Sequence, residues 1–187
     1  MKELLTERLR LRGFRDGDLP ALVAMNRDSE VMRYIRTVGS EAEETRKAEA
    51  LIADNQDEPL GVWAVEGRGD GRFHGAAMLK CLPEAEDVEV GYRLIKNAWG
   101  CGIATEAAGR LRDYGFEEIG LEEIVAVADP DNAASHRVLR KIGLSFRGLR
   151  RAYGTDGLHF FALTRGDWQD WREAGGKPHI SGTGTPA

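Results

Sequence analysis

Cysteine is scarce in this sequence. The chain of 187 residues has two, Cys81 in an expected strand and Cys101 in a glycine-rich loop. Two thiols are too few for a disulfide framework or a structural zinc site, and the scattered histidines lack the spacing of metal ligands or of a nucleophile and its base. We therefore expect reduced thiols and no bound metal.

Long apolar stretches and excess positive charge are also missing. No run approaches the roughly eighteen residues that a spanning helix needs, and the Met-Lys-Glu-Leu-Leu start has no apolar signal core. The formal net charge is −5, which disfavours a nucleic-acid-binding protein, because phosphate contacts favour a basic domain. The sequence thus predicts a cytoplasmic protein with no membrane or nucleic-acid partner.

Apolar residues are plentiful, at 42% of the chain, and can form the core of one domain. We expect that domain over residues 1–173. Gly, Pro, Thr and Ser dominate the end of the chain, so residues 174–187 are predicted to be a flexible tail.

Hydrophobic periodicity predicts a mixed α/β fold. Ser40 and Glu43 match a capping box that opens a helix lasting to about Asn55, and Gly143 suits the end of another. The last hairpin is expected to turn at residues 154–157, which contain Asp-Gly. The expected strands are residues 8–12, 61–65, 73–82, 88–95, 124–128, 146–153 and 158–163, and the expected helices lie within 19–34 and at 40–55, 105–118 and 133–142.

The segment from Trp99 to Ala107 joins an expected strand to an expected helix. A helix start presents backbone N–H groups without intrahelical partners and carries partial positive charge, so anions bind there. Gly100 and Gly102 have no side chain to hold an anion away, and Ala104 is small. Thr105 adds a hydroxyl. We expect a backbone-amide cradle for a pyrophosphate.

Three kinds of nucleotide-binding site have a glycine loop of this sort and must be compared. A Walker loop is excluded because no Gly-Lys-Ser/Thr occurs. A Rossmann fingerprint would need Gly or Ala in place of Thr105 and a run of parallel strands; only Glu122, at a suitable distance, favours it. The third candidate is a coenzyme A site, and the flanking sequence supports it.

The residues 88–108, VEVGYRLIKNAWGCGIATEAA, resemble the central motif of the GNAT superfamily of acetyltransferases. Residues 132–144 resemble that superfamily's Asn-containing helix, which usually ends Lys-Leu-Gly-Phe. Residues 6–12 and 28–32 resemble one branch, the Rim-type ribosomal-protein N-terminal acetyltransferases. The resemblance covers about residues 5–172.

This resemblance implies the α/β GNAT fold, a central mixed, mostly antiparallel sheet of about seven strands flanked by helices. The sheet would be splayed between the 88–95 and 124–128 strands, where acetyl-CoA binds with its pantetheine arm near the backbone of Leu94 and Ile95. Trp99 stands where the family usually has Gln or Arg. The implied cofactor-binding residues are Leu94, Ile95, Trp99, Gly100, Cys101, Gly102, Ile103, Ala104, Thr105, Asn132 and Ser135.

Direct acetyl transfer needs a neutral amine, a stabilised oxyanion and a proton for the departing thiolate, but no covalent enzyme intermediate. Cys101 is therefore expected to be a spacer. The resemblance implies Glu89 as the general base, directly or through water. The alternative is a surface carboxylate, because strand alternation does not say which face is the cleft. Arg93 shares a face with Glu89, and an ion pair between them would lower the carboxyl pKa.

The proton donor is less defined. Many superfamily members use a Tyr in the Asn-containing helix, where this chain has Leu139. The Rim-type branch has Ser at the position of Ser135, which is therefore a coenzyme-binding residue first and a candidate proton donor second; the alternative is a polar residue that only starts the helix. Asn132 suits a cap, a pantetheine contact or both.

The acceptor side is expected to include the acidic residues Glu41, Glu43, Glu44 and Glu49, which suggests a cationic amine. Protein or peptide N-termini, polyamines and aminoglycosides all fit, and the Rim-type resemblance favours an N-terminus. A catalytically silent coenzyme A-binding module and a transferase of another acyl group, such as succinyl, stay open. Relatives are commonly dimers, so a homodimer is expected.

Overall fold

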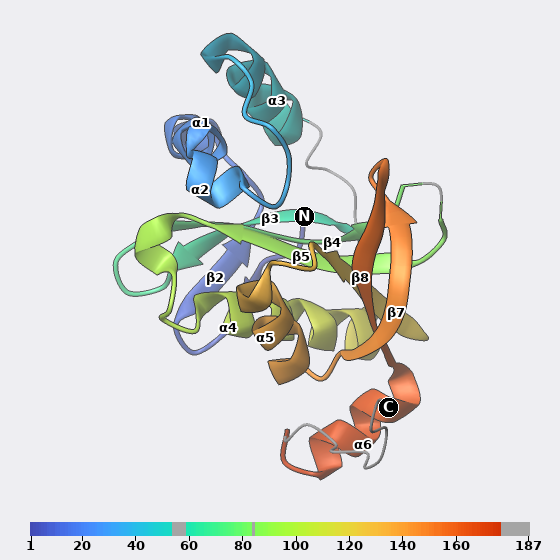
Figure 1. Cartoon of the computed structure of the whole chain (residues 1–187). Helices are drawn as coiled ribbons and strands as arrows, with labels where there is room; N and C mark the ends of the chain where they lie inside the picture. Colours follow the sequence, from blue (N-terminus) through green and yellow to red (C-terminus); the bar gives the residue numbers. More distant parts are fainter. Residues whose placement is uncertain (54–58, 84, 177–187) are drawn as a thin grey trace.

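The computed structural model describes residues 1–53, 59–83 and 85–176, and one open sheet forms its centre (Figure 1). Eight strands follow the order β1-β2-β3-β4-β5-β6-β8-β7. This is one strand more than predicted, because Leu4–Leu5 pairs with β2. The strands are β1 Leu4–Leu5, β2 Leu9–Arg12, β3 Gly61–Gly67, β4 Phe73–Cys81, β5 Val88–Leu94, β6 Glu123–Ala128, β7 Ser145–Ala152 and β8 Thr155–Thr164.

Helices cover both faces of the sheet. Helices α1, α2 and α3 lie over one face and α4 and α5 over the other, while α6 extends from the end of β8 (Figure 1). The α-helices are α1 Leu19–Arg27, α2 Ser29–Met32, α3 Glu41–Ala53, α4 Ile103–Tyr114, α5 Ala133–Lys141 and α6 Arg165–Glu173. Short 3-10 turns occur at η1 Asp16–Asp18 and η2 Lys96–Ala98, and a π-helical turn, η3 Gly115–Ile119, follows α4.

Local signals located some helix ends, such as the start of α3 and the start of α5, but missed α6. The Ser40 amide and hydroxyl donate to Glu43 Oε2 at 2.7 and 2.8 Å, which confirms the capping box before α3. The expected end of this helix, near Asn55, lies outside the described residues. Helix α4 begins two residues before its predicted start and gives way to η3 after Tyr114.

Alternate residues of β5 face the two helical layers. Val90 and Leu94 belong to the same buried cluster as Leu111 of α4. Arg93 points to the opposite layer, where its Nη1 lies 3.5 Å from Sδ of Met32 in α2. Side chains two residues apart share a face of a strand, so Glu89 also faces the α1–α3 layer.

The sheet is split in its middle. Strands β5 and β6 run parallel and have one residue pair in register, Glu89 with Val125. By contrast, the antiparallel ladder between β4 and β5 has seven pairs. Past that single pair the two central strands separate, which confirms the predicted splay between them.

The last hairpin turns at a different place from the prediction. Ala152 pairs with Thr155, so the turn consists of Tyr153 and Gly154, with φ of 54° and 75°. A two-residue hairpin turn of this twist needs positive φ at both positions. Gly157, with φ of 75°, lies inside β8 beside a register shift, which explains the misleading Asp-Gly signal.

The chain end is described as far as residue 176. Within the predicted tail, the Gly176 amide still donates to Trp171 O at 2.9 Å, so the first tail residues cap α6. Residues 177–187 lie outside the described part of the chain, and so does most of the predicted tail.

Candidate active site

The loop between β5 and α4 has the backbone geometry that an anion cradle requires. Gly102 is the N-cap of α4 with φ of 79°, and Gly100 has φ of 74°. Both values lie in the left-handed region that glycine adopts without a steric cost. No side chain caps the first turn of α4, so the amides of Ile103, Ala104 and Thr105 open the helix free of side-chain caps.

Two long side chains hold this loop in place. The Trp99 indole Nε1 donates to Leu94 O at 2.9 Å and ties the loop to the end of β5. Arg8, from the segment before β2, donates through Nη1 to Cys101 O at 3.0 Å and through Nε to Glu106 Oε2 at 2.6 Å. Sequence reasoning missed Arg8, because its partners lie about ninety residues away. Cys101 is a free, exposed cysteine whose thiol donates to Trp99 O at 3.4 Å.

Leu94 and Ile95 present their backbones in opposite directions. The Ile95 amide donates to His74 O at 3.0 Å, so it is engaged on the β4 side. Backbone groups of an antiparallel ladder alternate between the two neighbouring sides. Leu94 therefore presents its amide to the split, where the pantetheine arm was expected, whereas the Ile95 amide is already used.

Glu89 occupies the start of the split and is 3% exposed. Its Oε1 accepts from the Val127 amide of β6 at 3.3 Å, and its Oε2 accepts from the Tyr153 hydroxyl at the hairpin turn. Burial raises the pKa of the Glu89 carboxyl, although both hydrogen bonds and the charge of Lys80 oppose the rise. A buried carboxylate with a raised pKa is suited to accept a proton near neutral pH.

The ion pair between Glu89 and Arg93 that strand alternation made possible does not form. Among the described residues, no carboxylate of Glu89 or of any other side chain lies within ion-pair distance of the Arg93 guanidinium. The basicity of Glu89 is therefore not reduced by this neighbour.

A pair of hydroxyls lies on the face of the sheet opposite Glu89. The Tyr92 hydroxyl lies 3.0 Å from Ser135 Oγ and 3.2 Å from Ser135 O. Asn132 caps α5, because its Oδ1 accepts from the Ser135 amide at 3.1 Å. Burial raises the pKa of Tyr92, with the Ser135 hydrogen bond opposing, so this hydroxyl keeps its proton at neutral pH. Leu139 is 1% exposed and belongs to the core.

Tyr92 is the functional candidate that sequence reasoning missed. Strand alternation places it on the face opposite Glu89, which directs its side chain toward α5. That much could have been found in the sequence, but the meeting with Ser135 depends on how α5 packs. Glu89 and the Tyr92–Ser135 pair therefore flank the split from its two faces.

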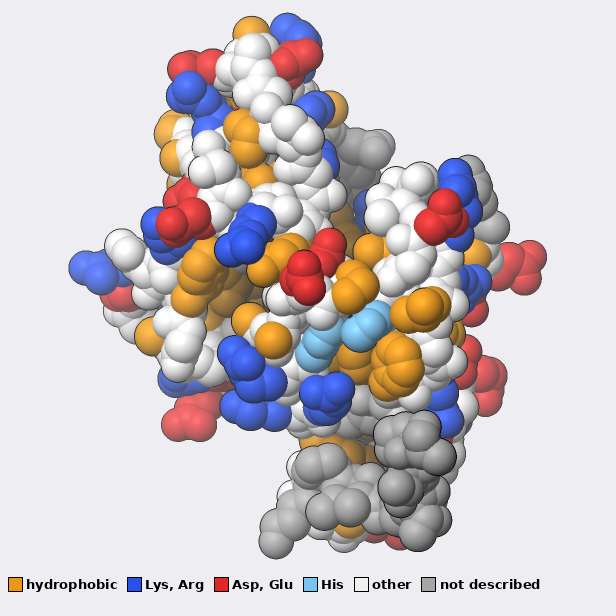
Figure 2. Space-filling view, in the orientation of Figure 1, with side chains coloured by type: hydrophobic (Ala, Val, Ile, Leu, Met, Phe, Trp, Pro, Cys, Tyr) orange, Lys and Arg blue, Asp and Glu red, His pale blue; other side chains and the backbone are white. Residues whose placement is uncertain are grey.

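The surface of the protein is hollowed beside helices α1–α3. Figure 2 shows a notch between the lobe of α1–α3 and the β7–β8 hairpin. A cavity of about 440 Å³ lies on the helical side and is lined by Met25, Val31 and Ile95 among others. A second, of about 390 Å³, adjoins Arg8 and Ile103 beside the loop. Glu89 lines neither of these two cavities, so its candidacy rests on its burial and hydrogen bonds and not on cavity size.

The glycine loop before α4 thus follows the split strand β5, with the Glu89 carboxyl on one face of the sheet and the Tyr92 and Ser135 hydroxyls on the other. The chain matches the family model described as an acetyltransferase (GNAT) domain over residues 8–145. The uncharacterised N-acetyltransferase YoaA of Bacillus subtilis (strain 168) is 33% identical over 153 residues, which cover 80% of this chain and 86% of YoaA. The chain belongs to the GNAT acetyltransferase family and is an acetyl-CoA-dependent acyltransferase.

Solved structures have the same fold. A GNAT-family acetyltransferase from Bacillus anthracis aligns with a TM-score of 0.75 at 25% identity, covering 88% of this chain and 99% of that one. RimL, described as a ribosomal L7/L12 alpha-N-protein acetyltransferase in complex with coenzyme A, aligns with a TM-score of 0.71 at 17% identity. The alignment covers 87% of this chain and 98% of RimL. Within residues 1–53, 59–83 and 85–176, no helix is long and apolar enough to cross a bilayer, and no three potential metal ligands cluster.

Proposed function

We propose that the protein moves an acetyl group directly from acetyl-CoA to a primary amine, with Glu89 as the general base. The observation that carries this proposal is the buried Glu89 carboxyl. Glu89 lies at the single residue pair that joins β5 and β6, and its carboxyl is hydrogen-bonded to groups from β6 and the final hairpin. Its raised pKa suits it to take a proton from an ammonium or an attacking amine.

The donor would be held by backbone more than by side chains. The amides of Ile103, Ala104 and Thr105 face the pyrophosphate, and Leu94 faces the pantetheine arm. Asn132 and Ser135 approach it from α5. The chemistry that acetyl-CoA supplies is a thioester carbonyl whose leaving group is a thiolate.

The Tyr92–Ser135 pair is the proposed source of the leaving-group proton. Ser135 lies at the N-terminus of α5, near the expected thiolate position, and its hydroxyl is within hydrogen-bonding distance of the Tyr92 hydroxyl. In this proposal Ser135 gives its proton to the thiolate and takes the Tyr92 proton in the same step, and Tyr92 regains a proton from solvent before the next turnover; this relay fills the role that Leu139 cannot perform. Cys101 has no part in this transfer, because direct transfer needs no covalent enzyme intermediate.

For the acceptor, we propose a protein or peptide N-terminus. RimL, which shares the fold, is described as an alpha-N-protein acetyltransferase. A polyamine, an aminoglycoside or another small amine is the alternative. Transfer of an acyl group other than acetyl is the second alternative, because the loop and split hold the coenzyme and not the acyl chain.

Thiol release from acetyl-CoA tests the proposal. The wild-type protein, Glu89→Gln and Ser135→Ala are assayed with N-terminal peptides, polyamines, aminoglycosides and amino acids. We expect amine-dependent release that Glu89→Gln largely abolishes and Ser135→Ala reduces. Thermal stabilisation by acetyl-CoA without release for any amine would instead identify a silent coenzyme A-binding module.

A further inference from the structure

A second buried charge faces the acceptor layer from β5. Arg93 is partly exposed as a residue, yet its Nε is buried without a hydrogen-bond partner. Among the described residues, the acceptor found for its guanidinium is Met32 Sδ, at 3.5 Å from Nη1. Sulfur is a weak acceptor. The guanidinium is therefore partly buried, and its Nε has neither solvent nor, within the described part of the chain, a protein acceptor beside it.

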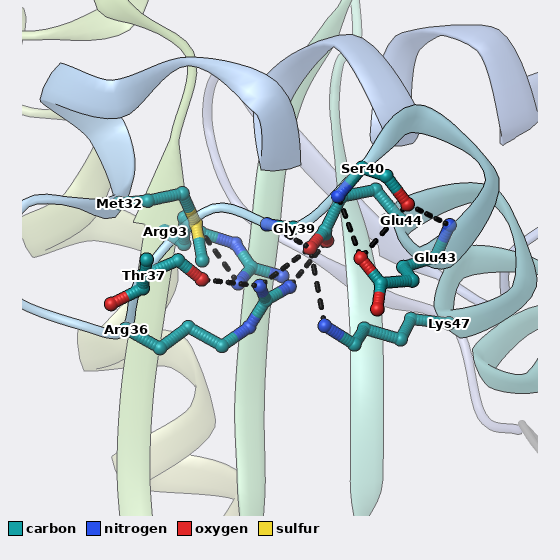
Figure 3. Close-up of polar contacts among 9 residues, drawn as sticks. All are labelled: Met32, Arg36, Thr37, Gly39, Ser40, Glu43, Glu44, Lys47 and Arg93. Atoms are coloured by element: carbon teal, nitrogen blue, oxygen red, sulfur yellow. Dashed lines mark hydrogen bonds and ion pairs between the residues drawn. The ribbon is translucent and has the colours of Figure 1, made fainter.

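The neighbouring carboxylate is already committed to other cations (Figure 3). Glu44 is fully buried, and it accepts from Arg36 Nη1 at 2.7 Å and from Lys47 Nζ at 3.1 Å. Burial and the nearby Arg36 charge lower the pKa of Arg93 to about 10, and Glu44 opposes this only in part. Arg93 still carries its charge at neutral pH, so the cluster of Arg36, Glu44, Lys47 and Arg93 has a surplus of positive charge.

Two other residues of the acidic run have partners within the protein. Glu41 forms an ion pair with Arg27 at 2.8 Å, and Glu43 is the capping partner of the neutral Ser40. Glu41 and Glu44 are thus paired with cations of the protein itself, which leaves less negative charge to attract a cationic acceptor. Arg93, by contrast, faces the α1–α3 layer with no carboxylate partner among the described residues.

Arg93 and Glu89 stand at two ends of one strip of the sheet. They share a face of β5 with Gly91 between them, and four residues of strand separate their Cα atoms by ~13 Å. Gly91 contributes no side chain, and Met78 of β4 lies over it, because a Cβ on Gly91 would meet Met78 Cε at 2.5 Å. The strip therefore has a carboxylate base at one end, an apolar middle and a guanidinium at the other.

We propose that the acceptor carries a carboxylate that Arg93 binds, about ten ångströms from the amine presented to Glu89. This inference rests on the proposed acetyl transfer to an amine and names the class of that amine. A guanidinium binds a carboxylate through two parallel hydrogen bonds, which lysine cannot reproduce. An extended chain of three residues spans roughly 10 Å, so an acidic N-terminal segment, a short free peptide and a long ω-amino acid share the required chemistry.

Matched acceptor pairs test this proposal. Each pair has the same amine and differs in one carboxylate: trialanine and its C-terminal amide, Ala-Asp-Ala-amide and Ala-Asn-Ala-amide, and 8-aminooctanoate and its amide. The kcat/KM from thiol release is measured for wild type, Arg93→Gln, Arg93→Lys and the control Arg33→Gln, which removes an exposed arginine of the same lobe. Circular dichroism checks the fold of each variant.

We expect the acid member of at least one pair to be preferred by about tenfold or more in kcat/KM, because its carboxylate forms charge-assisted hydrogen bonds with Arg93 that the amide cannot form. The pair that shows the preference identifies the carboxylate's source. Arg93→Gln should reduce it to less than about twofold and Arg93→Lys should lower it in part, while Arg33→Gln leaves it intact. Equal turnover of acid and amide in every pair, or a preference that survives Arg93→Gln, overturns the inference.

Failure of acetyl transfer itself has a different signature. In that case no amine, acid or amide, raises thiol release above hydrolysis. Calorimetric binding of the same pairs to the full chain with coenzyme A then decides the question of Arg93, because an Arg93-dependent preference for the acid member needs no turnover. If Arg93→Gln does not fold, the wild-type acid-to-amide ratio and the Arg93→Lys variant give the answer.

Discussion

Replacing Glu89 by glutamine is expected to have two opposite effects: loss of most acetyl transfer and a gain in stability at neutral pH. Glutamine has nearly the same shape: its Oε1 can accept from the Val127 amide, and its Nε2 can donate to the Tyr153 oxygen once that hydroxyl turns its proton away. The substitution removes the charge and keeps both contacts. Loss of a general base typically lowers kcat/KM by about 10²–10⁴-fold, and the affinity for acetyl-CoA should be unchanged.

The stability effect follows from the raised pKa of Glu89. Its ordinary value is 4.5, and burial, which leaves the side chain 3% exposed, raises it in the folded protein. Such a group contributes stability below the unfolded pKa and loses it as pH rises through the folded pKa. Above that pKa, the buried carboxylate lowers the free energy of unfolding by ~1.4 kcal/mol for each unit by which its pKa is raised. Glutamine carries no such cost.

Urea unfolding between pH 4 and pH 8.5 measures this difference. We expect Glu89→Gln to exceed wild type in free energy of unfolding by on the order of 1 kcal/mol at pH 8, with the excess vanishing toward pH 4. Glu123→Gln, at an exposed position of β6, is the control and should show no such trend. A Glu89→Gln protein that is less stable than wild type at pH 8, or that keeps its activity, would refute the reasoning.

Three further changes probe the surroundings of the reaction. Tyr153→Phe removes a hydrogen bond that lowers the pKa of Glu89, so the acid limb of the pH profile of kcat/KM should move to higher pH. Tyr92→Phe should lower kcat by roughly tenfold to a hundredfold with the calorimetric Kd of acetyl-CoA unchanged, because the hydroxyl contacts Ser135 and not the expected phosphates. Gly102→Ala places a side chain at φ of 79°, which costs about 1–2 kcal/mol and should weaken acetyl-CoA binding in the same calorimetric assay.

Two of these changes have a matched control. Tyr34→Phe removes a hydroxyl from the helical lobe and should leave kcat as it is. Gly69→Ala adds a methyl group where no atom lies within 4 Å and φ is not positive, so it should leave acetyl-CoA binding intact. An unmoved acid limb in Tyr153→Phe would show that this hydroxyl does not bond to Glu89 during turnover.

The parts of the site that neighbouring residues encode could be predicted from the sequence. The Gly100 and Gly102 loop needs only backbone freedom and a following helix, and both are written within a few residues. The Ser40–Glu43 box is equally local. The expected splay came from a resemblance across the 88–108 segment and not from periodicity, which cannot say which strands lie side by side.

The parts that depend on distant contacts were missed. Tyr153 adopts an unfavourable left-handed conformation, yet its hydroxyl reaches Glu89, 64 residues earlier in the chain. The local Asp-Gly sequence therefore predicted the wrong position for the turn, which a tertiary contact accompanies. Arg8 and Tyr92 were missed for the same reason, since nothing near them in sequence reveals the Cys101 carbonyl or the Ser135 hydroxyl.

The single residue pair between β5 and β6 has a consequence for how the sheet fluctuates. Strands β1–β5 and β6–β8 form two antiparallel halves, each with long ladders. In most sheets the central amides resist hydrogen exchange best and the edges least. Here the amides along the split, such as that of Leu94, lie at the centre of the molecule but behave as edge groups. A coenzyme that bonds to them would therefore act as a missing strand, and slow their exchange with solvent as it joins the halves.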